Sequence, residues 1–244
     1  MGGRGRHVAA LASIVAGVLA LPAGARAVVV KDNLYGVKAM SASEAWAVGN
    51  FGSIYHTTDA GKTWEARASG TKVPLFAVDF ADAEHGWIVG KSSTILATAD
   101  GGKTWKPEKS AIPPEKHLFN LKVIDARTVW VVGDWGAIAT TRDGGATWED
   151  RSLGDDVVLY AVSFPDAQHG FIAGEFGTLL ATADGGETWT ARELPEKQRL
   201  VWLRGVSLLP TSEGFTVGAS GFMAAIDHGN LVLPANAARA ASAP

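Results

Sequence analysis

Short apolar runs recur along the chain from residue 34 onward, and turns rich in Gly, Asp, Ala and Thr separate them. In a typical stretch, a run at residues 75–80 precedes an Asp-Ala-Glu-His turn, and further runs follow at residues 86–90 and 94–98. The runs are rich in β-branched and aromatic residues, which is typical of strands in all-β proteins. A fourth, more polar strand is expected to begin at the Thr-Trp pair at residues 104–105. The pattern therefore predicts four short strands in each unit.

This four-strand unit occurs five times. The copies begin at Leu34, Leu75, Leu118, Leu159 and Leu203, so that successive copies start 41, 43, 41 and 44 residues apart. A single four-stranded sheet cannot bury both of its faces, whereas repeated sheets of this length stack around an axis as propeller blades. We predict an all-β fold, a five-bladed β-propeller of four-stranded blades, spanning residues 28–234.

The outermost strand of the last blade has two candidates. Residues 231–233 follow the third strand of that blade directly. Residues 28–30, a run of three valines, would instead tie the first blade to the last and remove an open sheet edge. The sequence leaves both possibilities open.

The turn between the third and fourth strands follows the pattern Ser/Thr-x-Asp-x-Gly-x-Thr-Trp in four of the five copies. In such an Asp box, the short carboxylate accepts N–H bonds from its own turn, and the glycine supplies a positive φ angle. The tryptophan opens the next strand and buries a large ring. A catalytic or calcium-binding group is needed once rather than in every blade, so we interpret the boxes as structural. Their residues are Asp59, Gly61, Trp64, Asp100, Gly102, Trp105, Asp143, Gly145, Trp148, Asp184, Gly186 and Trp189.

The first 27 residues are expected to be a signal peptide rather than part of the fold. Arg4 and Arg6 form a basic start, and the apolar run at residues 8–21 is short for a membrane span. The Ala-Arg-Ala sequence that follows suits cleavage after Ala27. A retained membrane anchor is the competing interpretation. We therefore expect an exported, periplasmic protein.

Charge and cysteine content narrow the range of partners. The chain carries 22 basic and 25 acidic residues, and loss of Arg4, Arg6 and Arg26 leaves 22 − 3 = 19 basic residues and a formal charge of −6. Nucleic acid is not an expected partner of such an acidic chain. The chain has no cysteine, so its fold must be stable without disulfides despite export. The Ala-rich residues 235–244 are expected to be disordered.

The Asp boxes are the bacterial neuraminidase repeat. Together with the strand motifs Ala-Val-Gly-x-x-Gly and Gly-x-Ile-x-x-Thr, they make the chain similar to the photosystem II stability/assembly factor family over about residues 34–230. The resemblance implies a non-enzymatic scaffold, without cofactor, that binds a membrane protein or membrane-protein complex on the lumenal or periplasmic side and aids its assembly or stability. That family typically has seven blades, whereas this chain has five copies of the repeat. We expect a monomer.

A glycan-binding or sialidase-like glycoside hydrolase propeller is the alternative function, because the Asp box also occurs in such enzymes. The Arg-Ile-Pro motif that a sialidase resemblance would require is missing from the sequence. Tyr35 and Tyr160 stand where Phe76 and Phe119 stand in other copies, so we interpret them as packing residues. His85 recurs in the same turn as His169, which indicates a turn residue rather than a metal ligand, and we expect no metal site.

A partner-binding surface is expected where equivalent positions of the repeats differ. The turn between the second and third strands varies most, and three copies carry a large aromatic residue where turns normally carry small polar ones. Aromatic residues flanked by charges are typical anchors of protein interfaces. Alternatively, each ring folds back onto its neighbouring blade. The candidate binding residues in these turns are Phe51, Lys91, Asp134, Trp135, Glu175 and Phe176.

Arg204 is the remaining candidate. It replaces the aromatic residue that the other four copies carry in the innermost strand, which places one cation near the central channel. A guanidinium there can grip a carboxylate of a partner. Alternatively, it pairs with an acid of the chain itself, such as Asp79.

Overall fold

The structure is a computed structural model that describes residues 32–234. The predicted signal peptide at residues 1–27, the valine run at residues 28–30 and the predicted disordered tail at residues 235–244 lie outside the described residues. Within residues 32–234, no helix is long and apolar enough to cross a membrane.

The described chain folds into five antiparallel sheets of four strands, which confirms the predicted five-bladed β-propeller. Blade 1 comprises β1 (Leu34–Ala39), β2 (Ala45–Gly49), β3 (Ile54–Thr57) and β4 (Glu65–Arg67). Blade 2 comprises β5 (Leu75–Phe80), β6 (His85–Gly90), β7 (Ile95–Ala99) and β8 (Lys106–Pro107). Blade 3 comprises β9 (Leu118–Val123), β10 (Val129–Gly133), β11 (Ile138–Thr141) and β12 (Glu149–Asp150). Blade 4 comprises β13 (Leu159–Ser163), β14 (Gly170–Gly174), β15 (Leu179–Thr182) and β16 (Thr190–Ala191). Blade 5 comprises β17 (Leu203–Leu208), β18 (Gly214–Gly218), β19 (Met223–Asp227) and β20 (Asn230–Val232). Short 3-10 turns occur at η1 (Asn50–Gly52), η2 (Glu196–Gln198) and η3 (Ala219–Gly221).

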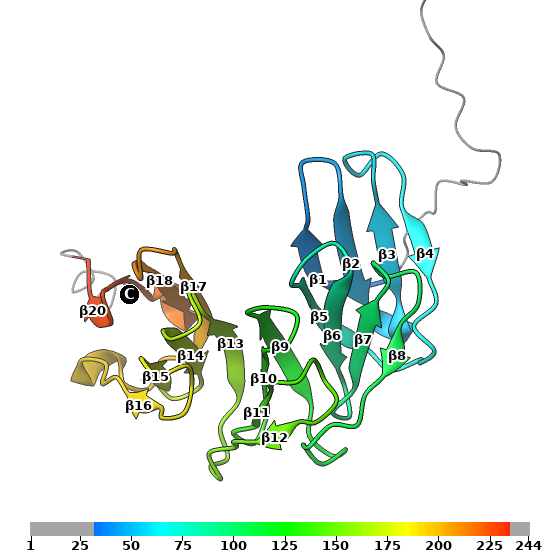
Figure 1. Ribbon diagram of the computed structural model, residues 1–244. Coiled ribbons are helices and arrows are strands. Elements are labelled where there is room, and N and C mark those ends of the chain that lie inside the picture. The colour runs from blue at the N-terminus through cyan, green and yellow to red at the C-terminus, as the bar shows by residue number, and fades with distance from the viewer. Residues whose placement is uncertain (1–31, 235–244) are drawn as a thin grey trace, which may run out of the picture.

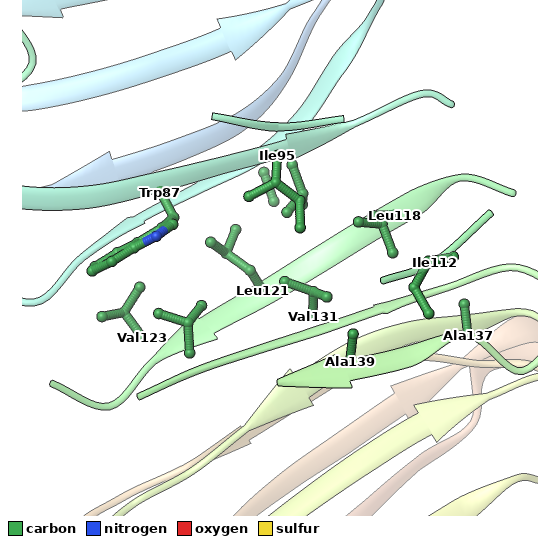
Figure 2. Packing of buried hydrophobic residues seen from close by; sticks show 12 residues of the cluster. Trp87, Ile95, Ile112, Leu118, Leu121, Val123, Val131, Ala137 and Ala139 are labelled. Atoms are coloured by element: carbon green, nitrogen blue, oxygen red, sulfur yellow. The ribbon is translucent and has the colours of Figure 1, made fainter. Parts of the chain in front are cut away.

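The hydrophobic core is divided into four seams, one between each pair of successive blades. We call the side of a blade that covers the next blade its forward face, and the side that meets the preceding blade its rear face. In the first seam, the forward face of blade 1 supplies Trp46, Val48 and Ile54, and the rear face of blade 2 supplies Leu75, Val78 and Phe80. Figure 2 shows the second seam, where Trp87 and Ile95 of blade 2 meet Leu118, Leu121 and Val123 of blade 3. The same repeat positions therefore form each seam.

The blades lie along an arc whose two ends stay apart (Figure 1). The first strands β1, β5, β9, β13 and β17 pack successively against one another along its inner side. In residues 32–234, no comparable packing joins blade 5 to blade 1. Strand β20 pairs with β19 and completes blade 5, so the C-terminal candidate provides the outermost strand. Within the described residues the arc is therefore not closed by a strand shared between its ends.

Each Asp box closes its own turn through its carboxylate. In the box of blade 3, Asp143 Oδ1 accepts bonds from Thr141 Oγ1 at 2.8 Å and from the Thr147 N–H at 2.9 Å, while Oδ2 accepts one from Thr147 Oγ1 at 2.6 Å. The same bonds recur around Asp59, Asp100 and Asp184. Side-chain and backbone bonds from the second threonine of each box are the main reason why the pKa of all four carboxyl groups falls from 3.8 to about 2.

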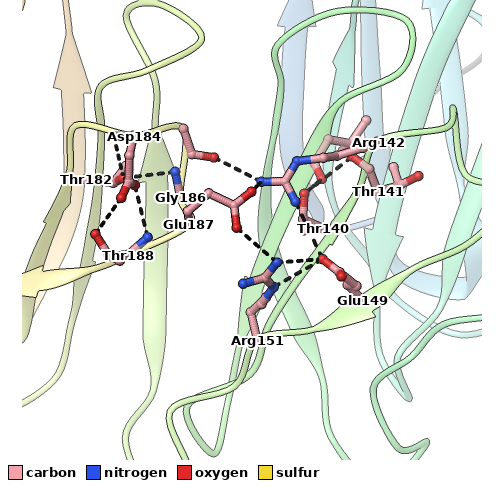
Figure 3. A network of polar contacts seen from close by, with 12 residues as sticks. Thr140, Thr141, Arg142, Glu149, Arg151, Thr182, Asp184, Gly186, Glu187 and Thr188 are labelled. Atoms are coloured by element: carbon pink, nitrogen blue, oxygen red, sulfur yellow. Dashed lines mark hydrogen bonds and ion pairs between the residues drawn. The ribbon is translucent and has the colours of Figure 1, made fainter.

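Charged side chains reinforce the boundary between blades 3 and 4 on the outside of the molecule. Figure 3 shows Arg142 between Glu187 and Glu149, with Arg151 beside the same two carboxylates. The Arg142 Nη2 to Glu187 Oε1 distance is 2.7 Å. Glu187 belongs to the Asp box of blade 4, drawn in the same view through Asp184 and Thr188. Exposed pairs contribute about 0–1 kcal/mol each, so the apolar seam carries most of the stability here.

Candidate partner-binding face

The turn between the second and third strands holds a residue with left-handed backbone in every blade. The φ angles are 57° at Phe51, 58° at Ser92, 54° at Trp135, 51° at Phe176 and 55° at Ser220. This conformation costs a non-glycine residue about 1–2 kcal/mol and is unusual for bulky side chains. Three of the five blades nevertheless place an aromatic residue there.

The three aromatic residues at these turns are exposed to solvent over more than half of their surface. Phe51 is 72 % exposed, and Trp135 and Phe176 are each 55 % exposed. An exposed ring contributes little packing energy, so packing does not offset the cost of the left-handed backbone at these positions. Such strain is commonly retained where a ligand or partner binds.

A second row of aromatic residues lies on the inner side of the arc. The pairing of the first with the second strand skips one residue in every blade, and the skipped residues are Tyr35, Phe76, Phe119, Tyr160 and Arg204. Each is therefore the extra residue of a β-bulge. Bulges change the direction of a side chain and are common beside functional sites.

These bulge residues contact one another from blade to blade. The ring centroids of Tyr35 and Phe76 lie 5.6 Å apart, those of Phe76 and Phe119 5.4 Å, and those of Phe119 and Tyr160 6.3 Å. The Arg204 guanidinium lies 4.1 Å from the Tyr160 ring centroid and 5.0 Å from that of Trp202. We call this row, from Tyr35 to Arg204, the aromatic ladder. Tyr35 is half exposed, and the other three rings are partly buried.

Hydrogen bonds connect the aromatic ladder to the turns of the same blades. The Tyr35 hydroxyl donates to Asn50 Oδ1 at 2.9 Å, and the Tyr160 hydroxyl donates to Glu175 Oε1 at 2.9 Å. Burial, followed by the bond to Glu175, raises the pKa of the Tyr160 hydroxyl. The ladder and the turns with Phe51 and Phe176 therefore lie at the same end of the blades and form one continuous face.

The other predicted turn residues also lie on this face. Asp134 accepts a bond from the His117 N–H at 2.6 Å and so anchors the approach to the first strand of blade 3. The Lys91 side chain is exposed. Beside Phe176 is a hollow of about 750 Å³, which Arg192 and Arg199 also line. A smaller hollow of about 390 Å³ borders Phe51.

Arg204 does not pair with Asp79, so that part of the sequence interpretation was wrong. Asp79 is buried near the other end of the first strand, where Lys38 of blade 1 lies 2.6 Å from Oδ1. Its Oδ2 accepts a bond from the Val123 N–H of blade 3 at 2.9 Å. Asp79 thus links three blades. Among residues 32–234 no carboxylate forms an ion pair with Arg204, whose guanidinium is exposed.

The four rings of the aromatic ladder are the part of the face that sequence reasoning missed, because Tyr35 and Tyr160 were interpreted as packing residues, whereas Arg204 was predicted as a binding residue. One sequence signal was available. Leu34 and Val37 are three residues apart and correspond to Leu75 and Val78, which pack in the same seam. Strand alternation puts residues three apart on opposite faces, so this spacing requires a bulge at the residue after the leucine.

The comparisons with known proteins agree with this architecture. A family model described as photosynthesis system II assembly factor YCF48 matches residues 70–157 and 148–230, and a BNR/Asp-box repeat model matches residues 55–66. Among curated proteins, no sequence matches the chain.

Three solved structures illustrate the fold. A structure of YCF48 bound to D1 peptide shares 20 % identity at a TM-score of 0.64, over 82 % of this chain and 66 % of that one. The chain thus spans about two thirds of that relative. The GH74 enzyme of Niastella koreensis shares 15 % identity at a TM-score of 0.63, over 79 % of this chain and 36 % of the enzyme. Virginiamycin B lyase from Staphylococcus aureus shares 10 % identity at a TM-score of 0.62, over 80 % and 69 % of the two chains.

At these identities, the solved structures support the propeller fold alone. The family model, in contrast, covers most of the sequence, including the inner strands of blades 3, 4 and 5 with Phe119, Tyr160 and Arg204. The chain therefore belongs to the family of photosynthesis system II assembly factor YCF48, and four of its five blades carry an Asp box.

Proposed function

We propose that this protein is an exported, non-catalytic scaffold that binds a segment of a membrane protein on the periplasmic side and aids the assembly or stability of that partner. The single observation that carries the proposal is the face on which three strained, exposed aromatic rings adjoin the aromatic ladder. Rigid aromatic anchors beside charged groups are typical of protein-binding sites. The relative described as YCF48 bound to D1 peptide supports a peptide segment as the kind of ligand.

The face offers complementary contacts to an extended peptide. Its rings provide apolar anchor sites about one blade apart, and the exposed Arg204 guanidinium at the blade 5 end can donate two parallel hydrogen bonds to a carboxylate. The Tyr160 ring holds this guanidinium in place. We propose that a carboxylate of the partner, from a side chain or a chain end, binds Arg204 while apolar side chains contact the ladder.

The test is a cross-linked pull-down from membranes with the purified protein. The test variant carries Phe51→Ala, Trp135→Ala and Phe176→Ala. The matched control carries Glu84→Ala, Arg127→Ala and Gln168→Ala, three exposed side chains at the opposite end of the blades that make no side-chain bond within residues 32–234. Wild type and control should recover the same membrane complex, and the folded test variant should lose it. Recovery of no protein by the wild type would contradict the scaffold function.

One observation favours the second candidate, a glycan-binding or sialidase-like propeller. Tyr160 and Glu175 form a hydrogen-bonded Tyr/Glu pair beside Arg204, and such a pair provides the nucleophile in sialidase-like sites. The discriminating experiment is hydrolysis of fluorogenic sialosides and other glycosides by wild type, Tyr160→Phe and Glu175→Gln. Turnover that both substitutions abolish would support the enzyme, whereas absent turnover favours the scaffold.

A further inference from the structure

The two ends of the arc expose the same side chains that the seams bury. On the forward faces of blades 1 to 4, the positions equivalent to Trp46, Val48 and Ile54 are at most 5 % exposed. Their counterparts on blade 5 are Phe215, Val217 and Met223, and these are 65 %, 48 % and 59 % exposed. Val217 pairs directly with Met223, and Phe215 lies two residues before Val217 on the same strand. The forward face of blade 5 therefore presents one continuous apolar surface.

The rear face of blade 1 shows the matching change. The leucines that open blades 2 to 5 are fully buried, whereas Leu34 of blade 1 is 42 % exposed. Val78 is 6 % exposed in the first seam, and its counterpart Val37 is 72 % exposed. The forward face of blade 5 and the rear face of blade 1 thus carry the same apolar residue types as the buried seams, although no blade in residues 32–234 covers either face. Folded monomers rarely leave contiguous apolar surface of this kind uncovered.

The repeat itself indicates what covers these faces. Each covered forward face in the chain lies against the rear face of another copy of the same repeat. In the described chain, the uncovered forward face belongs to blade 5 and the uncovered rear face belongs to blade 1. Since blades 5 and 1 of one chain do not pack against each other, the matching surface is available on a second chain.

We propose that the forward face of blade 5 packs against the rear face of blade 1 of a second copy of this protein, and so forms a fifth seam between chains. This assembly replaces the monomer expected from the sequence. The contact is head-to-tail, so that each copy offers two different surfaces, and successive copies close into a ring or extend as a chain. The partner-binding face at the ends of the blades stays accessible, because it lies outside the seams.

The test uses two lysine variants of the purified protein, each at one end of the arc. Val37→Lys and Phe215→Lys replace exposed side chains, so both variants should fold, which circular dichroism checks. A lysine in an apolar seam is an unpaired buried charge, and we expect each variant alone to associate at least about 100-fold more weakly than wild type. Leu200→Lys is the control, because Leu200 is 71 % exposed but lies outside both end faces.

Mixing the two variants tests the head-to-tail geometry. Each variant retains the surface that the other lacks, so an equimolar mixture should form a dimer that cannot grow further. Sedimentation velocity at micromolar concentration should show wild type and Leu200→Lys as assemblies, each variant alone as a 25.5 kDa chain less any cleaved signal peptide, and the mixture as a dimer. A monomeric wild type, an equal loss with Leu200→Lys, or a monomeric mixture would overturn the proposal. None of these results depends on the membrane partner.

Discussion

The glycine of an Asp box provides the sharpest test of how the blades fit together. An ideal Cβ on Gly186 would lie 2.2 Å from Cζ2 of Trp130 on the preceding blade. Trp130 is fully buried and has little room to move, since its ring lies 5.8 Å from that of Phe164 and 5.6 Å from that of Trp189. Gly61 is the matched control. Its φ of 79° is close to the 84° of Gly186, but the nearest atom to its ideal Cβ is 3.7 Å away.

The two alanine substitutions therefore share one cost and differ in another. Both place alanine in left-handed backbone, which costs about 1–2 kcal/mol. Only Gly186→Ala also requires Trp130 to move. The Cβ to Cζ2 distance must grow from 2.2 Å to the 3.4 Å of an ordinary contact, which is 3.4 − 2.2 = 1.2 Å. Such overpacking of a core costs about 1–3 kcal/mol. The free energy of unfolding should fall by about 1–2 kcal/mol in Gly61→Ala and by about 2–5 kcal/mol in Gly186→Ala.

Urea unfolding followed by far-ultraviolet circular dichroism measures both variants, with an unchanged m-value as the check on two-state behaviour. The double variant Trp130→Phe with Gly186→Ala should lose less stability than the sum of the single changes, because the smaller ring leaves room for the methyl group. Equal losses in the two glycine variants, or additive effects in the double variant, would refute the packing of the tryptophan on the box.

Three further outcomes are expected. Asn tolerates left-handed backbone, so Trp135→Asn should leave the free energy of unfolding unchanged or raise it by up to about 1 kcal/mol. The same variant should no longer capture the partner. A large loss of stability would show that the ring has a packing role. Asp79→Ala should lower the free energy of unfolding, measured in urea, by about 1–3 kcal/mol. The reason is that the buried Val123 N–H loses its acceptor and Lys38 loses its ion-pair partner. An unchanged urea midpoint would contradict the linking role of Asp79. The free energy of unfolding, measured at a series of acidic pH values, should show two opposite effects. The box carboxylates have their pKa lowered from 3.8 to about 2 in the folded state, so their contribution is present above 3.8 and lost as the pH falls toward 2. Glu108 directly follows β8 and accepts a hydrogen bond from the Trp148 indole N–H at 2.9 Å. Burial raises the pKa of this carboxyl group above 4.5, so its ionisation lowers stability as the pH rises from 4.5 through the raised value, and Glu108→Gln should remove this decrease.

Periodicity carried most of the fold prediction, because each blade repeats one burial pattern. The leucine that opens every unit marks the innermost strand, and the box Asp marks the last turn. The hydrogen bonds that hold each Asp box are local to its turn, so the box motif alone is enough to predict that turn. The outer strand of blade 5 was left between two candidates because both are short apolar runs, and pairing between β19 and β20 decided the matter.

One feature depends on contacts between blades and could not be predicted from the sequence. Val37 and Val78 are the same residue type at the same repeat position, so only the structure shows that one is exposed and the other buried. The direction of the Tyr35 and Tyr160 rings depends instead on the bulge that precedes Gly36 and Ala161, which the spacing of Leu34 and Val37 indicates from the sequence. Arg204 contacts the Tyr160 ring because the two bulges are adjacent, whereas the sequence left pairing with an acid such as Asp79 as one of two alternatives.

Site-specific photo-cross-linking tests the central claim, that the protein holds a membrane-protein segment against its aromatic face, most directly. A benzoylphenylalanine residue is placed at position 51, 135 or 176, and at 84, 127 or 168 for comparison, and the proteins are irradiated in the presence of native membranes. The scaffold predicts that the first three positions cross-link to one segment of one membrane protein and that the other three do not. Cross-links to the opposite end of the blades alone, or to no membrane protein from any position, would contradict it.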